Sequence, residues 1–215
     1  MNKEEFIEEL KKINIELSKE QLEKLDKFYN LLVEWNKKIN LTRIISEEEV
    51  YLKHFYDSLT ITKVVDLNKV DTLCDVGTGA GFPGIVLKIV YPNLKITLID
   101  SLLKRVKYLN EIIKDLELEN IEAIHTRGED HKEKYDVVTA RAVANIEKLL
   151  TYTMHLVNDD GIFIAMKGDV DKEITPKIKN KINKKYKIET INKFYLPKEE
   201  SIRALVVIKN KQRIY

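Results

Sequence analysis

The chain has 215 residues, of which 44% are hydrophobic and 33% charged, and its formal net charge is +2. These values are typical of a globular protein with a full core, and no apolar run approaches the roughly 18 residues of a membrane span. The acidic start MNKEEFIEEL is unlike a secretion signal, and a single cysteine excludes an internal disulfide, so we expect a cytoplasmic protein.

Helices dominate the first third of the chain. Three helical segments are predicted there, at residues 4–13, 18–39 and 46–59. Apolar residues in the second segment recur at steps of three and four and form one stripe. Ser18 with Gln21 has the spacing of a capping box, and Ser46 with Glu49 repeats it. We assign residues 1–67 to an N-terminal helical extension.

From about residue 70 the pattern changes to strands that alternate with helices. Five strands are predicted, at VDTLCDV (70–76), LKITLID (94–100), IEAIH (121–125), YDVVTA (135–140) and GIFIAMK (161–167). This alternation predicts a parallel, doubly wound sheet. KYKIETINKFYL and IRALVVIK then predict an antiparallel pair at one edge. The fold class is therefore α/β, with a mostly parallel, Rossmann-like sheet of seven strands in residues 68–215.

The stretch DVGTGAGFPG, from Asp75 to Gly84, holds four of the seven glycines of the chain. It follows the first predicted strand, where open α/β sheets bind their ligands, and it precedes a helix that we expect to begin near Pro83. A tight turn without a ligand needs one or two glycines rather than four. We therefore predict that Gly77, Gly79 and Gly81 let the main chain approach a nucleotide-type cofactor.

Two acidic residues favour S-adenosylmethionine as this cofactor. The fragment GAGFPG matches the dinucleotide fingerprint, but Gly77 and Thr78 separate it from the strand. A carboxylate at Asp75 would repel a pyrophosphate, whereas it would attract the ammonium and sulfonium charges of S-adenosylmethionine. Asp100 closes the next strand, where a carboxylate can accept hydrogen bonds from ribose hydroxyls.

The stretches DVGTGAGFPGIVLKIVYP and LIDSLLKRVKYL resemble the bacterial small-subunit rRNA guanine-N7 methyltransferase family, once called glucose-inhibited division protein B. The resemblance extends over nearly the whole chain and includes EWNKKINLT, HFYDSL, AMKG and RALVVIK. It implies a class I methyltransferase that uses S-adenosylmethionine to methylate N7 of one guanosine in 16S ribosomal RNA. It also implies cofactor contacts at Gly77 and Phe82, an adenine contact at Gly128 and Glu129, and a catalytic position for Arg141 between cofactor and target base.

Methylation at N7 uses a lone pair that guanine already carries, so we expect catalysis by alignment, without a general base. We interpret Cys74 as a packed core residue rather than a nucleophile. Only six of the 37 basic residues are arginine, so an arginine beside the cofactor is a candidate for recognition. We assign Arg141 and Arg127 to positioning.

Basic residues outside the glycine loop are candidates for RNA binding. The cluster with Lys104 and Arg105 follows the glycine region, Arg127 follows the third predicted strand, and Arg203 opens the last one. A solvated, lysine-rich surface or a structural salt bridge is the alternative for each of them.

The four histidines do not have the spacing of a metal site, and no metal is predicted. His54 and Asp57, three apart on a predicted helix, are expected to hydrogen-bond each other. The partner we expect is 16S rRNA or a small-subunit assembly intermediate, with no membrane, and the protein is expected to be a monomer.

Three alternatives remain open on the sequence. One is a methyltransferase for a protein or small molecule, and another is an RNA-binding assembly factor with a vestigial cofactor site. An NAD-dependent oxidoreductase is the third. An increase in melting temperature with S-adenosylmethionine, or with NAD, would separate them.

Overall fold

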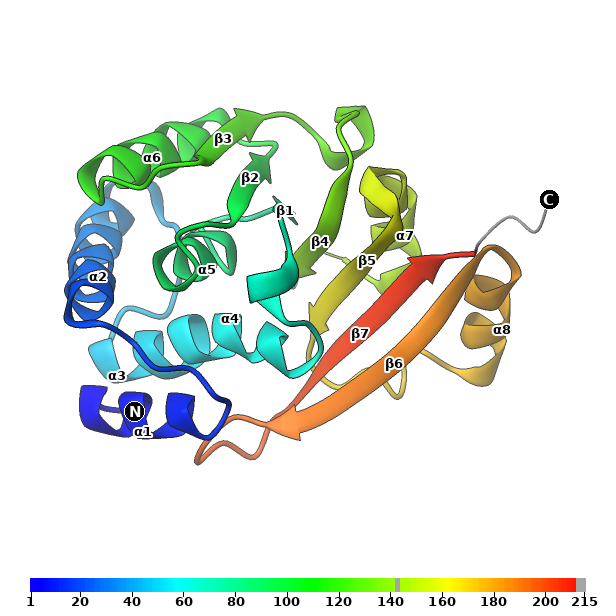
Figure 1. Ribbon diagram of the computed structural model, residues 1–215, viewed down its shortest axis with the longest axis horizontal. Helices are drawn as coiled ribbons and strands as arrows, with labels where there is room; N and C mark the ends of the chain where they lie inside the picture. Colours follow the sequence, from blue (N-terminus) through cyan, green and yellow to red (C-terminus); the bar gives the residue numbers. More distant parts are fainter. Residues whose placement is uncertain (142–143, 212–215) are drawn as a thin grey trace.

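A seven-stranded sheet runs through the molecule, with helices on both of its faces (Figure 1). This computed structural model describes residues 1–141 and 144–211. The strand order is β3-β2-β1-β4-β5-β7-β6, in which β7 is antiparallel to β5 and β6 and the other pairs are parallel. The prediction of a parallel sheet with an antiparallel edge pair is confirmed. The strands are β1 (Thr72–Val76), β2 (Lys95–Asp100), β3 (Ile121–His125), β4 (Tyr135–Arg141), β5 (Val157–Lys167), β6 (Tyr186–Tyr195) and β7 (Ile202–Asn210).

The helices divide unequally between the two faces of the sheet. The first six pack into one hydrophobic cluster with one face, and α7 and α8 pack into a second cluster on the other. The helices are α1 (Lys3–Lys11), α2 (Lys19–Ile39), α3 (Glu47–Val50), α4 (Asp57–Leu59), α5 (Gly84–Val90), α6 (Leu103–Asp115), α7 (Ile146–Thr153) and α8 (Pro176–Lys185). None of the helices in the described ranges has the length and apolarity needed to cross a bilayer.

The two clusters follow from the alternation of side chains along each strand. In β1, Leu73 belongs to the first cluster and Cys74 to the second, and both are fully buried. Successive residues of a strand point to opposite faces, so a strand covered on both sides is apolar along its length. This is why the inner strands could be recognised as short apolar runs. Cys74 is, as expected, a packed residue, and burial raises the pKa of its thiol well above the usual value.

The N-terminal helices are joined to the sheet through aromatic side chains. Phe28 of α2 packs against Phe55, with ring centroids 5.7 Å apart, and against Phe82 of the glycine loop, at 5.3 Å. All three rings are buried in the first cluster. The helical extension therefore shares one core with the sheet and packs against the glycine loop.

The two expected capping boxes have different outcomes. At the start of α2, Ser18 and Gln21 exchange side-chain and backbone hydrogen bonds, as predicted. The prediction for Ser46 was wrong, because its hydroxyl donates to the Glu49 carboxylate at 2.8 Å and caps no backbone group.

Two elements differ from the sequence-based expectation. The helical run at 46–59 is interrupted by a π-helical segment, Tyr51–Tyr56, a feature that is frequent at functional sites. Helix α8 was not predicted, since Ile178 and Ile182 are its only apolar residues.

Candidate active site

A cavity of about 680 Å³ lies at the carboxyl ends of β1, β2 and β4, which is where open α/β sheets bind ligands. We call it the main cavity. The glycine loop after β1 forms one wall, Arg141 at the end of β4 another, and the N-terminal helices a third. A smaller hollow of about 260 Å³, the side hollow, shares Gly77, Asp100 and Ser101 with it. The two form one continuous binding region.

The glycine loop has a backbone that residues with a Cβ rarely adopt. The φ angles of Gly77, Gly79 and Gly81 are +73°, +61° and +94°. The amides of Gly77 and Thr78 both donate to the Ile99 carbonyl of β2, which fixes the loop to the sheet. Left-handed turns of this kind are open to glycine at little cost, and they expose the main chain to a ligand.

The glycines of this loop serve two different purposes. A Cβ on Gly79 would meet only the Gly77 carbonyl oxygen, at 3.9 Å, so Gly79 borders open space in the main cavity. A Cβ on Gly81 would lie 2.6 Å from Cγ1 of Ile85. Gly81, expected to contact the cofactor, is instead absent from the cavity wall and allows close packing against α5.

Asp75 lies beneath the glycine loop rather than in the cavity wall. Its side chain is fully buried, and one carboxylate oxygen accepts a hydrogen bond from the Gly84 amide at 2.9 Å. Burial raises the pKa of this carboxyl to about 6, against the effect of the Gly84 amide. Asp75 therefore holds the start of α5, and its expected contact with the cofactor remains a prediction.

Asp100 lines both the main cavity and the side hollow, as a ribose-binding residue should. Its carboxylate accepts hydrogen bonds from the Gly79 amide at 3.0 Å, the Leu102 amide at 2.9 Å and the Arg105 guanidinium at 3.2 Å. The residue is 2% exposed. Asp100 thus couples the conformation of the glycine loop to the end of β2.

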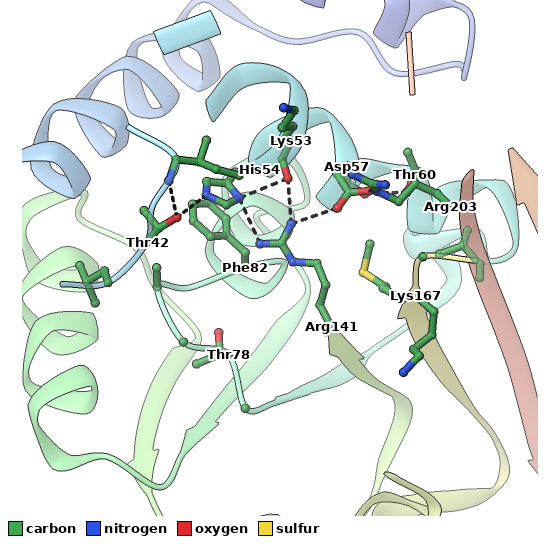
Figure 2. Close-up of a pocket in the computed structure, with 18 of the residues that line it drawn as sticks. Thr42, Lys53, His54, Asp57, Thr60, Thr78, Phe82, Arg141, Lys167 and Arg203 are labelled. Atoms are coloured by element: carbon green, nitrogen blue, oxygen red, sulfur yellow. Dashed lines mark hydrogen bonds and ion pairs between the residues drawn. The ribbon is translucent and has the colours of Figure 1, made fainter. Parts of the chain in front are cut away.

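Arg141 reaches from β4 across the main cavity to the N-terminal helices (Figure 2). Its Nη1 donates to the Lys53 carbonyl and to the Asp57 carboxylate, each at 3.1 Å, and its Nη2 lies 3.3 Å from Nδ1 of His54. The guanidinium carbon is 5.2 Å from the centre of the Phe82 ring. Arg141 therefore forms one wall of the cavity and joins the sheet to the N-terminal helices.

His54 is held as a neutral ring by these contacts. Nδ1 of His54 lies 3.3 Å from Nη2 of Arg141 and 3.2 Å from the Lys53 carbonyl oxygen, and Nε2 lies 3.0 Å from the Thr42 hydroxyl. Burial, together with the nearby charge of Arg141, lowers the pKa of His54 to about 3. The ring stacks on Phe82 at 4.4 Å.

The prediction of a hydrogen bond between His54 and Asp57 was wrong. Both residues bind Arg141 instead, which comes from a distant part of the chain. Asp57 also pairs with Arg203, at 3.5 Å, so its carboxylate lies between two guanidinium groups. Two polar side chains inside the apolar run HFYDSL were a signal that partners must exist, but the sequence did not identify those partners.

The side hollow is where the expected adenine contacts lie. Gly128 and Glu129 line it, together with Arg127 and Val76. A Cβ on Gly128 would lie 2.8 Å from the Tyr152 carbonyl oxygen, so this position must be glycine for packing reasons as well. The exposed side chains of Arg127 and Glu129 approach each other at 4.0 Å.

The residues expected to bind RNA fall into two groups. Arg203 and Arg105 line the main cavity, each next to a carboxylate. Arg127 lies at the side hollow, and Lys104 is exposed and lines neither space. Five cationic side chains line the main cavity against two carboxylates, Asp57 and Asp100: they are Lys53, Arg105, Arg141, Lys167 and Arg203. Each of these cations is also paired with a carboxylate, since Lys53 pairs with Glu49 and Glu199, and Lys167 pairs with Glu173.

Several residues of the cavity were not singled out in the sequence. The Thr78 hydroxyl lines the cavity, is buried and has no hydrogen-bond partner in the described part of the chain. Lys167 donates to the Ala144 carbonyl at 2.6 Å and pairs with Glu173 at 3.1 Å. Within residues 1–141 and 144–211, no cluster of three or more potential metal ligands is found.

Comparison with known proteins identifies the relatives of this chain. The family described as rRNA small subunit methyltransferase G matches residues 21–203. The chain belongs to this family. It is 48% identical to a ribosomal RNA small subunit methyltransferase G of Bacillus licheniformis, over 99% of this chain and 92% of the relative. It is 45% identical to the protein of that name in Bacillus subtilis, over 97% and 90%.

Solved structures, among them a methyltransferase, share the fold at low sequence identity. A SAM-dependent methyltransferase from Aquifex aeolicus aligns with a TM-score of 0.57 at 17% identity, over 82% of this chain and 97% of that one. The complex of MtNAS with MTA and tNA aligns with a TM-score of 0.61 at 14% identity, over 86% and 74%. The methyltransferase fold expected from the sequence is confirmed.

Proposed function

We propose that the protein transfers the methyl group of S-adenosylmethionine to N7 of a guanosine in 16S ribosomal RNA. Membership of the rRNA small subunit methyltransferase G family supports the class of reaction and the rRNA substrate. The choice of N7 depends on one observation, namely that the proton acceptors of the main cavity are already engaged.

The residues around the glycine loop fit this cofactor. Gly79 leaves room for a ligand against the main chain, and Asp100 offers remaining carboxylate lone pairs at the end of β2. The unpartnered hydroxyl of Thr78 is a donor suited to the carboxylate of the methionine part. When bound, S-adenosylmethionine supplies an electrophilic methyl group on a sulfonium. We infer that the side hollow, with Gly128 and Glu129, takes the adenine.

The engaged acceptors favour a nucleophile that needs no deprotonation. Asp57 lies between Arg141 and Arg203, and Asp100 accepts three hydrogen bonds and is assigned to the ribose with its remaining lone pairs. Both ring nitrogens of His54 already have polar contacts, and its pKa of about 3 makes it a poor base. Guanine N7 carries a free lone pair, so alignment of the two reacting atoms is sufficient.

The residues of this chain then act by position and charge. The fork of Arg141 is fixed by Asp57, His54 and the Lys53 carbonyl, so it holds the cavity wall rigid beside the transferring group. The remaining cations attract the RNA and can bind phosphate or the O6 acceptor of guanine.

The test uses 16S rRNA from a strain that lacks the gene. The purified protein should transfer labelled methyl groups to this RNA, and the product should be N7-methylguanosine at one position. Transfer to another atom would overturn the N7 assignment. Binding of rRNA without transfer would favour an assembly factor, and transfer to a protein or small molecule alone would exclude RNA as the substrate.

A further inference from the structure

Helix α8 lies on the opposite side of the molecule from the N-terminal helices α1 and α2 (Figure 1), and its sequence contains a stripe of lysines. The spacing of Lys177, Lys181, Lys184 and Lys185 places them on one side of the helix, next to the buried Ile182. All four lysines are exposed. Lys181 pairs with Glu147 at 2.7 Å, and the other three form no ion pair with any described residue.

A groove of about 650 Å³ borders this stripe between α7 and α8. We call it the lysine groove. Lys181 and Lys185 line it from α8, Lys148 and His155 from the other side, and Tyr186 closes one end. The ammonium of Lys185 lies 5.3 Å from the centre of the Tyr186 ring. The groove thus combines several cations with an aromatic face.

The lysine groove adjoins the side hollow of the candidate active site. Lys148 lines both the groove and the side hollow, and the side hollow shares Gly77 and Asp100 with the main cavity. Arg127 lies in the side hollow between them. Basic residues therefore line both the side hollow and the lysine groove, together with the acidic residues Glu129 and Glu147.

We propose that the lysine stripe of α8, with the lysine groove beside it, binds the sugar–phosphate backbone of the rRNA outside the nucleotide that is methylated. This inference rests on the proposed rRNA substrate. Closely spaced phosphates are the anions that a row of solvated lysines binds best, and α8 spans about 15 Å, enough for several of them. The exposed large apolar residues, Ile45, Leu102, Leu103 and Tyr195, all lie on other elements, so the groove does not suit a membrane or an apolar protein surface.

The test compares the salt dependence of rRNA binding for the wild type and for the variant Lys177→Gln/Lys184→Gln/Lys185→Gln. Each lost phosphate contact lowers the slope of log K against log salt by about 1, so the slope should fall by about 2–3. Affinity for naked 16S rRNA near physiological salt should fall about tenfold or more. Affinity for S-adenosylmethionine should stay at the wild-type value, which shows that the variant is folded.

The matched control removes three exposed lysines from elements outside the groove, Lys11→Gln/Lys95→Gln/Lys114→Gln. An equal loss of slope in the control would mean that only net charge matters and would overturn the proposal. Wild-type binding of naked rRNA by the α8 variant would also overturn it, even if binding to small-subunit particles fell. Failure of the proposed function is recognised separately, because the wild type would then methylate no rRNA.

Discussion

Two glycines of the glycine loop lack a side chain for different structural reasons. Gly79 borders open space in the main cavity, whereas Gly81 is pressed against Ile85 and Leu109. The sequence shows only that both positions are glycine. The loop therefore contains one glycine that packing requires and another that borders the space where we propose that the cofactor binds, and substitutions can separate these two roles.

Alanine at the two positions should have opposite dominant effects. Gly81→Ala adds a Cβ 2.6 Å from Ile85 at a φ of +94°, so the free energy of unfolding should fall by about 3 kcal/mol. Gly79→Ala should cost only about 1–2 kcal/mol of backbone strain, but it should weaken S-adenosylmethionine binding at least about tenfold. Chemical denaturation and calorimetric titration measure the two quantities. Equal cofactor affinity of Gly79→Ala and wild type would refute the assignment.

Arg141→Ala should abolish most methyl transfer while the fold persists. The variant lacks the guanidinium that fixes this wall of the cavity, and the resulting misplacement of the reacting groups should lower the rate about a hundredfold. Removing one partner of a buried pair also leaves Asp57 with Arg203 alone, so stability should fall by about 3 kcal/mol. Turnover and circular dichroism are measured together. Arg141→Lys, which retains the charge but not the fork, is the control and should recover stability more than rate.

The buried, neutral His54 makes stability depend on pH. Its pKa falls from 6.5 to about 3 on folding, so between these values the unfolded chain binds more protons and stability drops as pH falls. The drop should approach about 1.4 kcal/mol per pH unit at most. Asp75, with a pKa raised to about 6, acts in the opposite direction, so the difference between variants is the informative quantity.

His54→Gln should therefore flatten the dependence of the unfolding free energy on pH between 6.5 and 3, relative to the wild type. Exposed His125→Gln is the matched control, and it should leave that dependence unchanged. Denaturation curves at several pH values provide the measurement. A wild-type slope in the His54 variant would show that the ring is charged in the folded protein.

At the scale of elements, the segment that carries His54 and Asp57 links the extension to the site. It contains the π-helical segment, and its side chains contact Arg141 at the end of β4. Phe28 of α2 packs against the same region, because its ring contacts both Phe55 and Phe82. Packing in the helical extension should therefore influence the cofactor site.

A pair of phenylalanine substitutions tests this link. Phe28→Ala and Phe6→Ala each remove a fully buried ring and should each lower stability by about 3–5 kcal/mol. Phe28 contacts Phe82 in the cavity wall, whereas Phe6 packs on Tyr51. Only Phe28→Ala should also weaken S-adenosylmethionine binding, as measured by titration at a temperature where both variants are folded. Equal weakening in both would indicate a general effect of destabilisation.

The strands and most helices could be predicted because each one carries its own pattern. IEAIH gave β3 with both ends correct, and the apolar stripe gave α2. Helix α8 escaped because lysine and asparagine fill most of its positions and leave two isoleucines as the only apolar signal. The π-helical segment could not be predicted either, because a short run of buried residues shows no periodicity that distinguishes it from an α-helix.

The candidate site could be predicted only where its residues lie close together in the chain. The glycine loop and Asp100 were found from their place at strand ends. The contact of Arg141 with His54 and Asp57 joins positions 84 and more residues apart, which no local pattern records. The burial of Asp75 could not be predicted for the same reason, because it depends on how α5 packs over this residue.

At the scale of the whole molecule, the proposed boundary between residues 67 and 68 crosses a continuous core. The first hydrophobic cluster includes Phe28 and Phe55 from the extension as well as Phe82 and Ile85 from the sheet region. The division into an extension and a methyltransferase domain remains a prediction about organisation. Its energetic meaning can be tested by cutting the chain there.

The fragment 68–215 should not fold by itself. It would expose the apolar side of α5 and of the first cluster, and exposed patches of this kind lead to aggregation. We expect no cooperative thermal transition for the fragment and no heat stabilisation by S-adenosylmethionine, whereas the full chain should show both. A soluble fragment with a sharp transition would instead establish an independent domain.

The wall of the main cavity includes Leu41, near the beginning of the chain, and Leu205, near its end. During translation the first of these leaves the ribosome long before the second has been made. A nascent chain consequently has an incomplete pocket until β7 has been synthesised, so a chain cut before Ile202 lacks part of the cavity wall.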